Sequence, residues 1–423
     1  MVVELAAGAL AVEEIVSTTI YTGVAAYAVT KATMPLKATF SQIATTSYED
    51  SSLSLNRSHH TVTVVKDKAY IFGGKTTEKT MAGNEIHAIS LLSLAEAEKK
   101  ATDSQYAVIP AIAAAQINDK KSRGSEVPSP RYNHAACALN MYVAVFGGLD
   151  ENNELADEDG CLWLYNTANQ VWEHVETVPA PPPRANATLC MSGNGLVLYG
   201  GDTPTGDKLK DAWHFDYPTQ TWTALQSAPS SASKAIVAAG SLYLLDFPSN
   251  LAAELHSLAI SSPPSSEAQW TTHSIPINPL VSGLAPREGS LALPLEFGHG
   301  RNFLLYLLGR DRSDAWTLQL PPTEPAITHP KQSAAAVKDG IRSTVGANTG
   351  RLELGEVELN IPKSLDAAPP GTSGKLHPGP RAWAAADVMP DKTTVIIWGG
   401  TSRIDGSGHE ETTEGDGWMI RFE

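Results

Sequence analysis

One pattern recurs along this sequence, and that internal repeat limits the possible folds more than any other feature. In three copies an arginine stands 16 residues before the first glycine of a Gly-Gly pair, and in another copy the separation is 18 residues. These copies are Arg57 with Gly73-Gly74, Arg131 with Gly147-Gly148, Arg184 with Gly200-Gly201, and Arg381 with Gly399-Gly400. Such repetition predicts a chain built from adjacent copies of one supersecondary unit.

Two degenerate copies fill the interval between the third and the last of these repeats. The segment from Ser230 to Phe247 aligns without a gap and carries Asp246-Phe247 where the other copies carry glycines. The segment from Arg287 to Gly309 keeps the arginine and one glycine, with a longer turn between them. The sequence therefore predicts six repeats.

Each repeat has the composition of four short β-strands. β-branched and aromatic residues fill the strand-like segments, and Gly, Pro, Asn and Asp separate them. The third segment carries a tryptophan in four repeats, namely Trp163, Trp213, Trp316 and Trp418. Four strands per repeat predict an all-β fold, and six such repeats predict a six-bladed β-propeller.

The two ends of the repeat region predict how the ring closes. The chain ends within the third strand of the sixth repeat, at Trp418–Glu423, so that repeat lacks a fourth strand of its own. The segment Leu36–Ala44 precedes the first repeat and contains Phe40. We expect this N-terminal segment to supply the missing strand to the last blade, because closure removes exposed sheet edges.

The Gly-Gly pairs and the downstream tryptophans resemble the kelch repeat, in which a double glycine precedes a spaced tyrosine and tryptophan. The resemblance covers about residues 36–423 and implies a kelch-type propeller over that range.

Two regions lie outside the repeat pattern. Residues 1–35 form an alanine-rich extension, and the apolar spacing predicts a short helix over roughly residues 3–17. Residues 325–350 have too little apolar content to pack, so we expect a mobile insertion in the fifth repeat.

Charge and the N-terminal sequence bound the partners and the compartment. The net charge is −15 and the pI is about 5.3, which argues against binding to nucleic acid or to anionic membranes. The first segment carries Glu4, Glu13 and Glu14 without an early basic residue, unlike a secretory signal. We expect a cytoplasmic protein and leave the nucleus open as a second location.

Sequence signatures of catalysis are absent. There is no P-loop, no dinucleotide-binding glycine motif, no nucleophile elbow and no paired-histidine zinc motif. The Glu-x-x-x-Asp-x-x-x-His iron-binding stretch of the kelch specifier proteins is also absent. We therefore expect no cofactor and no metal site.

Arginines at the equivalent position of five repeats are the strongest candidates for binding. They are Arg57, Arg131, Arg184, Arg287 and Arg381. Equivalent positions in a propeller form a ring, so these side chains are expected to surround one mouth of the central channel. The resemblance to kelch substrate adaptors of ubiquitin ligases implies that arginines at this position bind acidic peptide motifs. A structural alternative stays open, in which the arginines bond loop carbonyls and hold the blades together.

Polar and aromatic residues follow these arginines closely and extend the candidate site. They are His59, His60, Asn133, His134, Asn186 and Trp383. These side chains offer hydrogen bonds and a stacking surface beside the positive charge. The sequence thus predicts a binding scaffold for an acidic peptide, an acidic protein segment or an anionic small molecule at an arginine-lined channel mouth. The alternative is a small-molecule enzyme of the lyase, isomerase or cyclase type with its active site in the same pocket.

Overall fold

The structure is a computed structural model that describes residues 35–44, 55–76, 80–91, 106–114, 126–156, 160–231, 234–249, 252–261, 267–277, 284–297, 301–321, 352–361, 375–403 and 411–423. The helix predicted over residues 3–17 and the insertion predicted over residues 325–350 lie outside the described residues.

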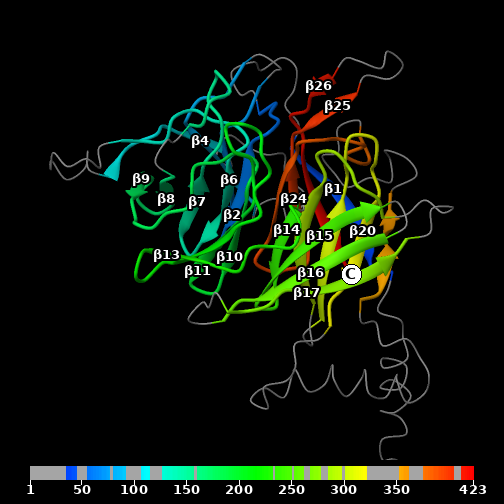
Figure 1. Cartoon of the computed structure of the whole chain (residues 1–423). Coiled ribbons are helices and arrows are strands. Elements are labelled where there is room, and N and C mark those ends of the chain that lie inside the picture. Colours follow the sequence, from blue (N-terminus) through cyan, green and yellow to red (C-terminus); the bar gives the residue numbers. More distant parts are fainter. Residues whose placement is uncertain are drawn as a thin grey trace, which may run out of the picture.

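The first three repeats form three four-stranded antiparallel sheets, which we call blades one to three (Figure 1). Blade one contains β2 (Thr61–Val65), β3 (Lys68–Phe72), β4 (Ile86–Ser90) and β5 (Tyr106–Ile109). Blade two contains β6 (Ala135–Leu139), β7 (Tyr142–Phe146), β8 (Leu162–Asn166) and β9 (Val171–Val175). Blade three contains β10 (Thr188–Ser192), β11 (Gly195–Tyr199), β12 (Ala212–Asp216) and β13 (Thr221–Ala224).

The degenerate repeats and the last repeat form blades four to six in the same way. Blade four contains β14 (Lys234–Ala238), β15 (Ser241–Ser249), β16 (Ala252–Ala259) and β17 (Thr271–Pro276). Blade five contains β18 (Leu291–Phe297), β19 (Arg301–Leu307), β20 (Ala315–Gln319) and β21 (Leu354–Glu356). Blade six contains β23 (Ala385–Val388), β24 (Thr394–Trp398), β27 (Gly417–Phe422) and β1 (Lys37–Ala44).

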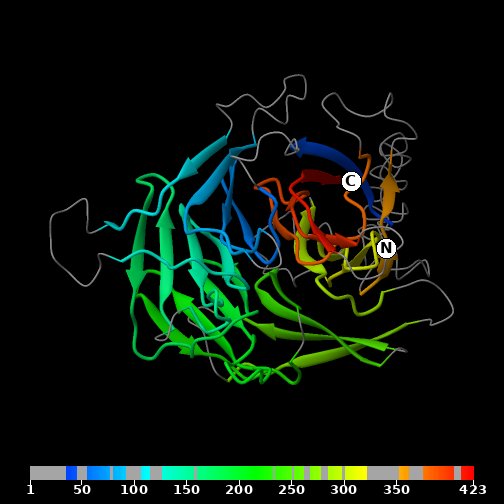
Figure 2. The same ribbon diagram turned by 90° about the horizontal axis from the view of Figure 1, so that it is seen from above.

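The blades close into a ring around an axis (Figure 2). The first strand of each blade contacts the first strands of both neighbouring blades, in the order β2, β6, β10, β14, β18, β23 and back to β2. The prediction of a six-bladed β-propeller is therefore confirmed.

The predicted closing strand is also confirmed. β1 pairs antiparallel with β27, with Phe40 opposite Ile420, and Figure 2 shows the blue and red segments side by side. The outer edge of β1 is covered in turn by β22 (Glu358–Asn360), which pairs with it in parallel. β22 follows β21 directly, so one short segment completes blade five and then protects the edge of blade six.

A hairpin of β25 (Thr401–Arg403) and β26 (Glu411–Thr413) extends the loop after the last glycine pair. The hydrophobic core lies between neighbouring blades. Between blades one and two, for example, Phe72 packs with Tyr165 and Trp172, and Trp172 is completely buried. Large rigid rings fill the wedge between the sheets, as the tryptophan positions in the repeats suggested.

The double glycines are required by close contact between blades. Gly73 has a φ of +60°, and a Cβ atom there would lie 2.3 Å from the carbonyl oxygen of Arg131 in the next blade. Gly74 then donates its N–H to that same oxygen at 2.8 Å. The same crowding occurs between Gly147 and the Arg184 carbonyl, at 2.1 Å. Only a residue without a side chain fits such a turn.

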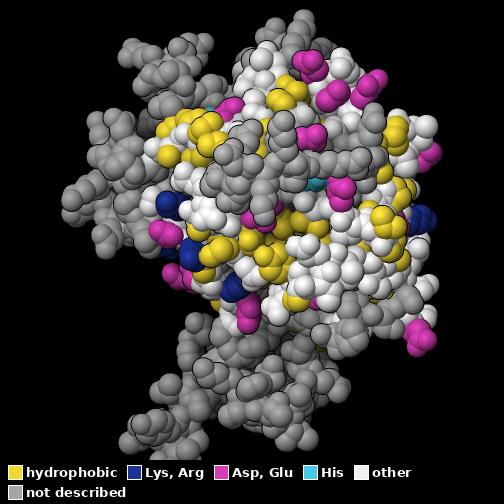
Figure 3. All heavy atoms as spheres, turned by 90° about the vertical axis from the view of Figure 1, so that its left-hand side faces the viewer, with side chains coloured by type: hydrophobic (Ala, Val, Ile, Leu, Met, Phe, Trp, Pro, Cys, Tyr) yellow, Lys and Arg dark blue, Asp and Glu magenta, His cyan; other side chains and the backbone are white. Residues whose placement is uncertain are grey.

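The outer surface carries mixed charge. On the face drawn in Figure 3, acidic side chains are scattered among hydrophobic ones, and lysine and arginine appear in a small group at the left and again at the right-hand edge. No basic stripe crosses this face. Within the described ranges, no helix has the length and apolar character needed to span a membrane.

Candidate functional site: the axial cavity

A cavity of about 500 Å³ opens at the axis, within the usual size range of ligand pockets. All six blades contribute to its wall. The lining residues are His59, His60, Asn133, His134, Asn186, Ala187, Thr188, Tyr199, Gly201, Asp202, Lys208, Leu209, Ser231, Lys234, Arg287, Glu288, Gly289, Trp383 and Ala384. Seven of the eleven residues predicted from sequence are among them: Arg287, His59, His60, Asn133, His134, Asn186 and Trp383.

Backbone hydrogen bonds between blades hold the rim of this cavity. The N–H of Asn186 donates to Asn133 at 2.8 Å, Asn133 to His59 at 3.0 Å, His59 to Trp383 at 3.0 Å, and Trp383 to Gly289 at 3.3 Å. All five residues have a positive φ, between 54° and 65°. Each stands two residues after the repeat arginine. The left-handed backbone turns these peptide groups along the ring, and the side chains line the cavity.

The arginines of blades one, two, three and six do not line the cavity, which corrects the expectation of an arginine-lined mouth. Arg57, Arg131, Arg184 and Arg381 are 0–2% exposed. Each donates from Nη1 to the carbonyl of the first glycine of its own blade, at 2.9–3.0 Å. Their guanidinium groups are directed into the blade, where the carbonyl of the glycine turn accepts from them.

Carboxylates compensate the buried arginine charge in blades three, five and six. Arg184 donates to both oxygens of Asp211, at 2.6 and 2.8 Å, and Trp213 Nε1 donates to Asp211 Oδ2 at 2.7 Å. The same triad recurs as Arg287, Asp314 and Trp316 and as Arg381, Asp416 and Trp418. A buried charge is tolerated only when it is paired and hydrogen-bonded. These contacts match the structural alternative for the arginines.

This triad has a signal in the sequence that arginine spacing alone misses. In blades three, five and six an aspartate stands two residues before the tryptophan of the third strand. Blade one has Glu85 and His87 at these positions, and Arg57 lies in hydrogen-bonding contact with both. A repeat arginine followed by an acid at this position indicates an internal ion pair.

Arg287 is the exception, because it contributes to the cavity wall. Its guanidinium group is nevertheless 2% exposed and donates to Asp314 Oδ2 at 2.9 Å. Its charge is therefore already matched by a carboxylate.

His59 and His134 are neutral at pH 7. His59 stacks on Trp383, with ring centroids 4.7 Å apart and planes at 18°. Burial, helped by Lys75 and Arg310, lowers the pKa of His59 to about 4. Burial and Arg131 lower the pKa of His134 to about 3.

His60 and His134 form a second tier below the rim, and both are 6% exposed. His134 Nε2 lies 2.8 Å from Thr61 Oγ1. His134 Nδ1 and both ring nitrogens of His60 have no hydrogen-bond partner in the described part of the chain. The described residues contain no group of three or more histidine, cysteine, aspartate or glutamate side chains placed to hold a metal ion.

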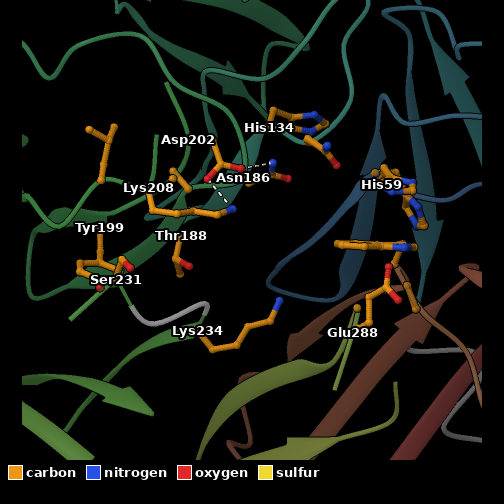
Figure 4. Close-up of a pocket in the computed structure, with 18 of the residues that line it drawn as sticks. His59, His134, Asn186, Thr188, Tyr199, Asp202, Lys208, Ser231, Lys234 and Glu288 are labelled. Carbon is orange, nitrogen blue, oxygen red and sulfur yellow. Dashed lines mark hydrogen bonds and ion pairs between the residues drawn. The ribbon is translucent and has the colours of Figure 1, made fainter. Parts of the chain in front are cut away.

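Two lysines that the repeat pattern did not predict, Lys208 and Lys234, also line the cavity. Lys208 forms an ion pair with Asp202 at 2.7 Å, and Asn186 Nδ2 donates to the other oxygen of Asp202 at 2.7 Å. Lys234 begins β14, and Figure 4 shows its amine directed into the cavity between the labelled residues of the two walls. Among the described residues, no carboxylate lies within 4 Å of Lys234 Nζ, and burial lowers the pKa of this amine.

A signal for Lys234 existed in the aligned repeats. The position four residues after the repeat arginine, or after Ser230 in blade four, is occupied by threonine, alanine or leucine in the other blades. Blade four alone has a basic residue there.

Comparison with known proteins agrees with the repeat pattern. Residues 59–245 match the family model described as the KLHDC2/KLHL20/DRC7 Kelch-repeats domain. A solved structure, that of YjhT, aligns over 87% of this chain and 97% of its own, with 13% sequence identity and a TM-score of 0.47.

Curated relatives match shorter segments. Tip elongation aberrant protein 1 of Schizosaccharomyces pombe is 37% identical over 92 residues, which are 21% of this chain and 8% of that protein. Adagio-like protein 1 of Oryza sativa subsp. japonica is 36% identical over 106 residues, or 24% of this chain and 16% of that protein. Kelch domain-containing protein 3 of Rattus norvegicus is 23% identical over 155 residues, or 36% of each chain. The matches therefore span well under two thirds of these relatives. The six-bladed propeller, with its repeated arginine, double-glycine and tryptophan positions, is thus similar to kelch-repeat propellers, and residues 59–245 match a kelch-repeat domain family.

Proposed function

We propose that this chain is a binding scaffold whose axial cavity takes an anionic group, carried by an acidic peptide or by a small molecule. The observation that carries the proposal is Lys234, whose amine is directed into the cavity without an acidic partner among the described residues. A desolvated ammonium group is stabilised by an anion that enters beside it.

The other charged groups of the cavity wall are already matched. Asp202 pairs with Lys208, and Arg287 pairs with Asp314. Glu288 accepts from Arg310 at 2.7 Å. Among the described lining residues, Lys234 therefore supplies the net charge that a ligand meets.

Uncharged donors line the same cavity as this amine. Thr188 and Ser231 line the cavity, and both appear on the same side as Lys234 in Figure 4. Their hydroxyl groups can donate to a carboxylate or phosphate that lies against Lys234. This set replaces the ring of arginines as the supporting basis for anion binding.

A direct test measures binding of fluorescein-labelled octaglutamate by anisotropy, with inorganic pyrophosphate as the small anion in competition. Lys234→Met should weaken binding by about tenfold or more, at the usual magnitude of a charged contact. Lys68→Met, which removes an exposed lysine at the start of β3, should leave affinity unchanged. Binding to the unmodified chain should weaken as salt increases.

Two results would contradict the proposal. One is equal affinity of the Lys234→Met variant and the unmodified chain for these probes. The other is the absence of binding by both probes at millimolar concentration.

A further inference from the structure

We infer that the ligand of the axial cavity carries a flat aromatic ring beside its anionic group, and that this ring stacks on Trp383. The inference rests on the proposed function, because the anionic group is assigned to Lys234. It adds the chemical class of the ligand: an aromatic carboxylate or phosphate.

Trp383 forms an aromatic part of the cavity wall and is held in place from two sides. Its N–H donates to Gly289 and its carbonyl accepts from His59, so both neighbouring blades fix its backbone. His59 stacks on the indole at 4.7 Å between centroids. The side chain remains partly exposed while it lines the cavity. A rigid indole surface in a pocket suits a flat ring.

The backbone of Trp383 is unusual for such a large residue. Its φ is +58°, a conformation that non-glycine residues seldom adopt and that is costly for a bulky side chain. The equivalent position in blade five is Gly289, which meets the same geometry without that cost. Tryptophan at the costly position is consistent with a role for its ring in binding.

The charge of the cavity selects against a cationic ring. His59 is neutral because burial lowers its pKa to about 4, so the aromatic wall itself carries no charge. Lys234 repels a second positive charge in the same cavity. The cavity therefore suits a ligand with an uncharged ring, which stacks on Trp383, and a separate anionic group, which pairs with Lys234.

The experiment compares ring-bearing and ring-free anions by calorimetry on the full chain. The probes are adenosine monophosphate against ribose 5-phosphate, and indole-3-acetate against acetate. Each ring-bearing anion should bind about tenfold or more tightly than its ring-free counterpart, as base–aromatic stacking allows. The phosphate and carboxylate pairs together show which anionic group the cavity prefers.

Variants assign the effect to Trp383. Trp383→Leu should abolish the advantage of the ring-bearing probes over their ring-free counterparts. Trp270→Leu, which replaces another partly buried tryptophan whose Nε1 donates to Gln226, should leave the advantage intact. Lys234→Met should weaken both kinds of probe.

The outcomes separate this inference from the proposed function. Equal binding of ring-bearing and ring-free anions to the unmodified chain overturns the aromatic assignment even if no variant folds. An advantage that persists in Trp383→Leu overturns it as well. Failure of Lys234→Met to weaken any probe overturns the proposed function itself.

Discussion

At the scale of single residues, the repeat arginines Arg57, Arg131, Arg184 and Arg381 each join two blades. Arg57 Nη1 donates to the Gly73 carbonyl of its own blade at 3.0 Å. The backbone carbonyl of Arg57 accepts from Gly400 of blade six at 2.7 Å. One residue thus fixes its own glycine turn and the glycine turn of the preceding blade. The charge serves the internal structure, so it is not available to a ligand.

The most buried of these pairs predicts a large stability effect. Arg381→Ala leaves the Asp416 carboxylate, 6% exposed, without its bidentate partner. Breaking a buried pair from one side costs about 3–5 kcal/mol, and we expect that loss in chemical denaturation. Arg403→Ala, which removes an exposed pair with Asp311, should change stability by less than about 1 kcal/mol. A stable Arg381→Ala variant with weakened anion binding would restore the ligand-binding role of the arginine.

Asp387, in β23, gives a pH prediction. Burial raises its pKa to about 6, although the N–H groups of Val64 and Val388 donate to its two oxygens. The folded state therefore favours the protonated form, and its stability should fall as pH rises from about 4 to about 6. Asp387→Asn removes this titration. From about pH 4 to about pH 6, the unfolding free energy of the unmodified chain should therefore fall by about 2–3 kcal/mol relative to that of the variant.

The quantity to compare is how the difference in unfolding free energy between the two proteins changes with pH. Its absolute value is not diagnostic, because an amide cannot accept both N–H bonds and the variant can therefore be less stable at every pH. Asp311→Asn, an exposed change, serves as the control. A difference that stays constant between pH 4 and pH 7 would show that Asp387 does not titrate in this range.

At the scale of structural elements, the glycine turn after the second strand joins the blades. In blade four Asp246-Phe247 replaces the glycines and Ser230 replaces the arginine. There, Tyr199 of blade three donates its hydroxyl group to the Ser230 carbonyl at 2.8 Å. A side chain thus takes over a contact that glycine N–H groups make in other blades. Blade four keeps its place in the ring although its repeat signature is lost.

Gly147 and Gly193 have similar φ angles but different surroundings, so alanine substitutions at these positions distinguish steric crowding from backbone strain. Gly147 has a φ of +64° and no room for a Cβ atom, while Gly193 has a φ of +58° and nothing within 4 Å. Gly193→Ala should cost about 1–2 kcal/mol, from the left-handed backbone alone. Gly147→Ala should cost several kcal/mol more, because the blade must move away from the Arg184 carbonyl. Equal melting temperatures of the two variants would contradict the close contact between the blades.

At the scale of the whole molecule, stability depends on closing the ring through β1. Phe40 is 4% exposed between blades five and six, while the neighbouring Thr39 faces solvent. Phe40→Ala should destabilise the chain by about 3–5 kcal/mol, as for other large core truncations. Thr39→Ala should have little effect.

Deletion of residues 1–46 tests the same closure more severely. The deletion removes β1, exposes the edge of β27 and leaves β22 without its partner. We expect loss of a single cooperative melting transition, or insoluble protein. A truncated chain that melts cooperatively at the temperature of the full chain would show that β1 is dispensable.

Local pattern explains why the sequence predicted so much of the fold. The spacing from Arg57 to Gly73 and its copies reports strand and turn lengths within one blade, and such lengths are properties of adjacent residues. The truncated last repeat and Phe40 revealed the closing strand because a missing strand must be supplied from elsewhere. Six blades and their closure therefore followed from the sequence alone.

The direction of side chains in the ring was decided only by tertiary structure. The repeats correctly placed His59, Asn133, Asn186 and Trp383 around the axis, but equivalent spacing cannot show whether Arg184 faces the channel or its own blade. That choice depends on the Gly200 carbonyl and on Asp211, which folding brings to the arginine. The position of Lys234 in the cavity was also decided by tertiary structure, because blade four presents its first strand to the axis and the other blades enclose the amine.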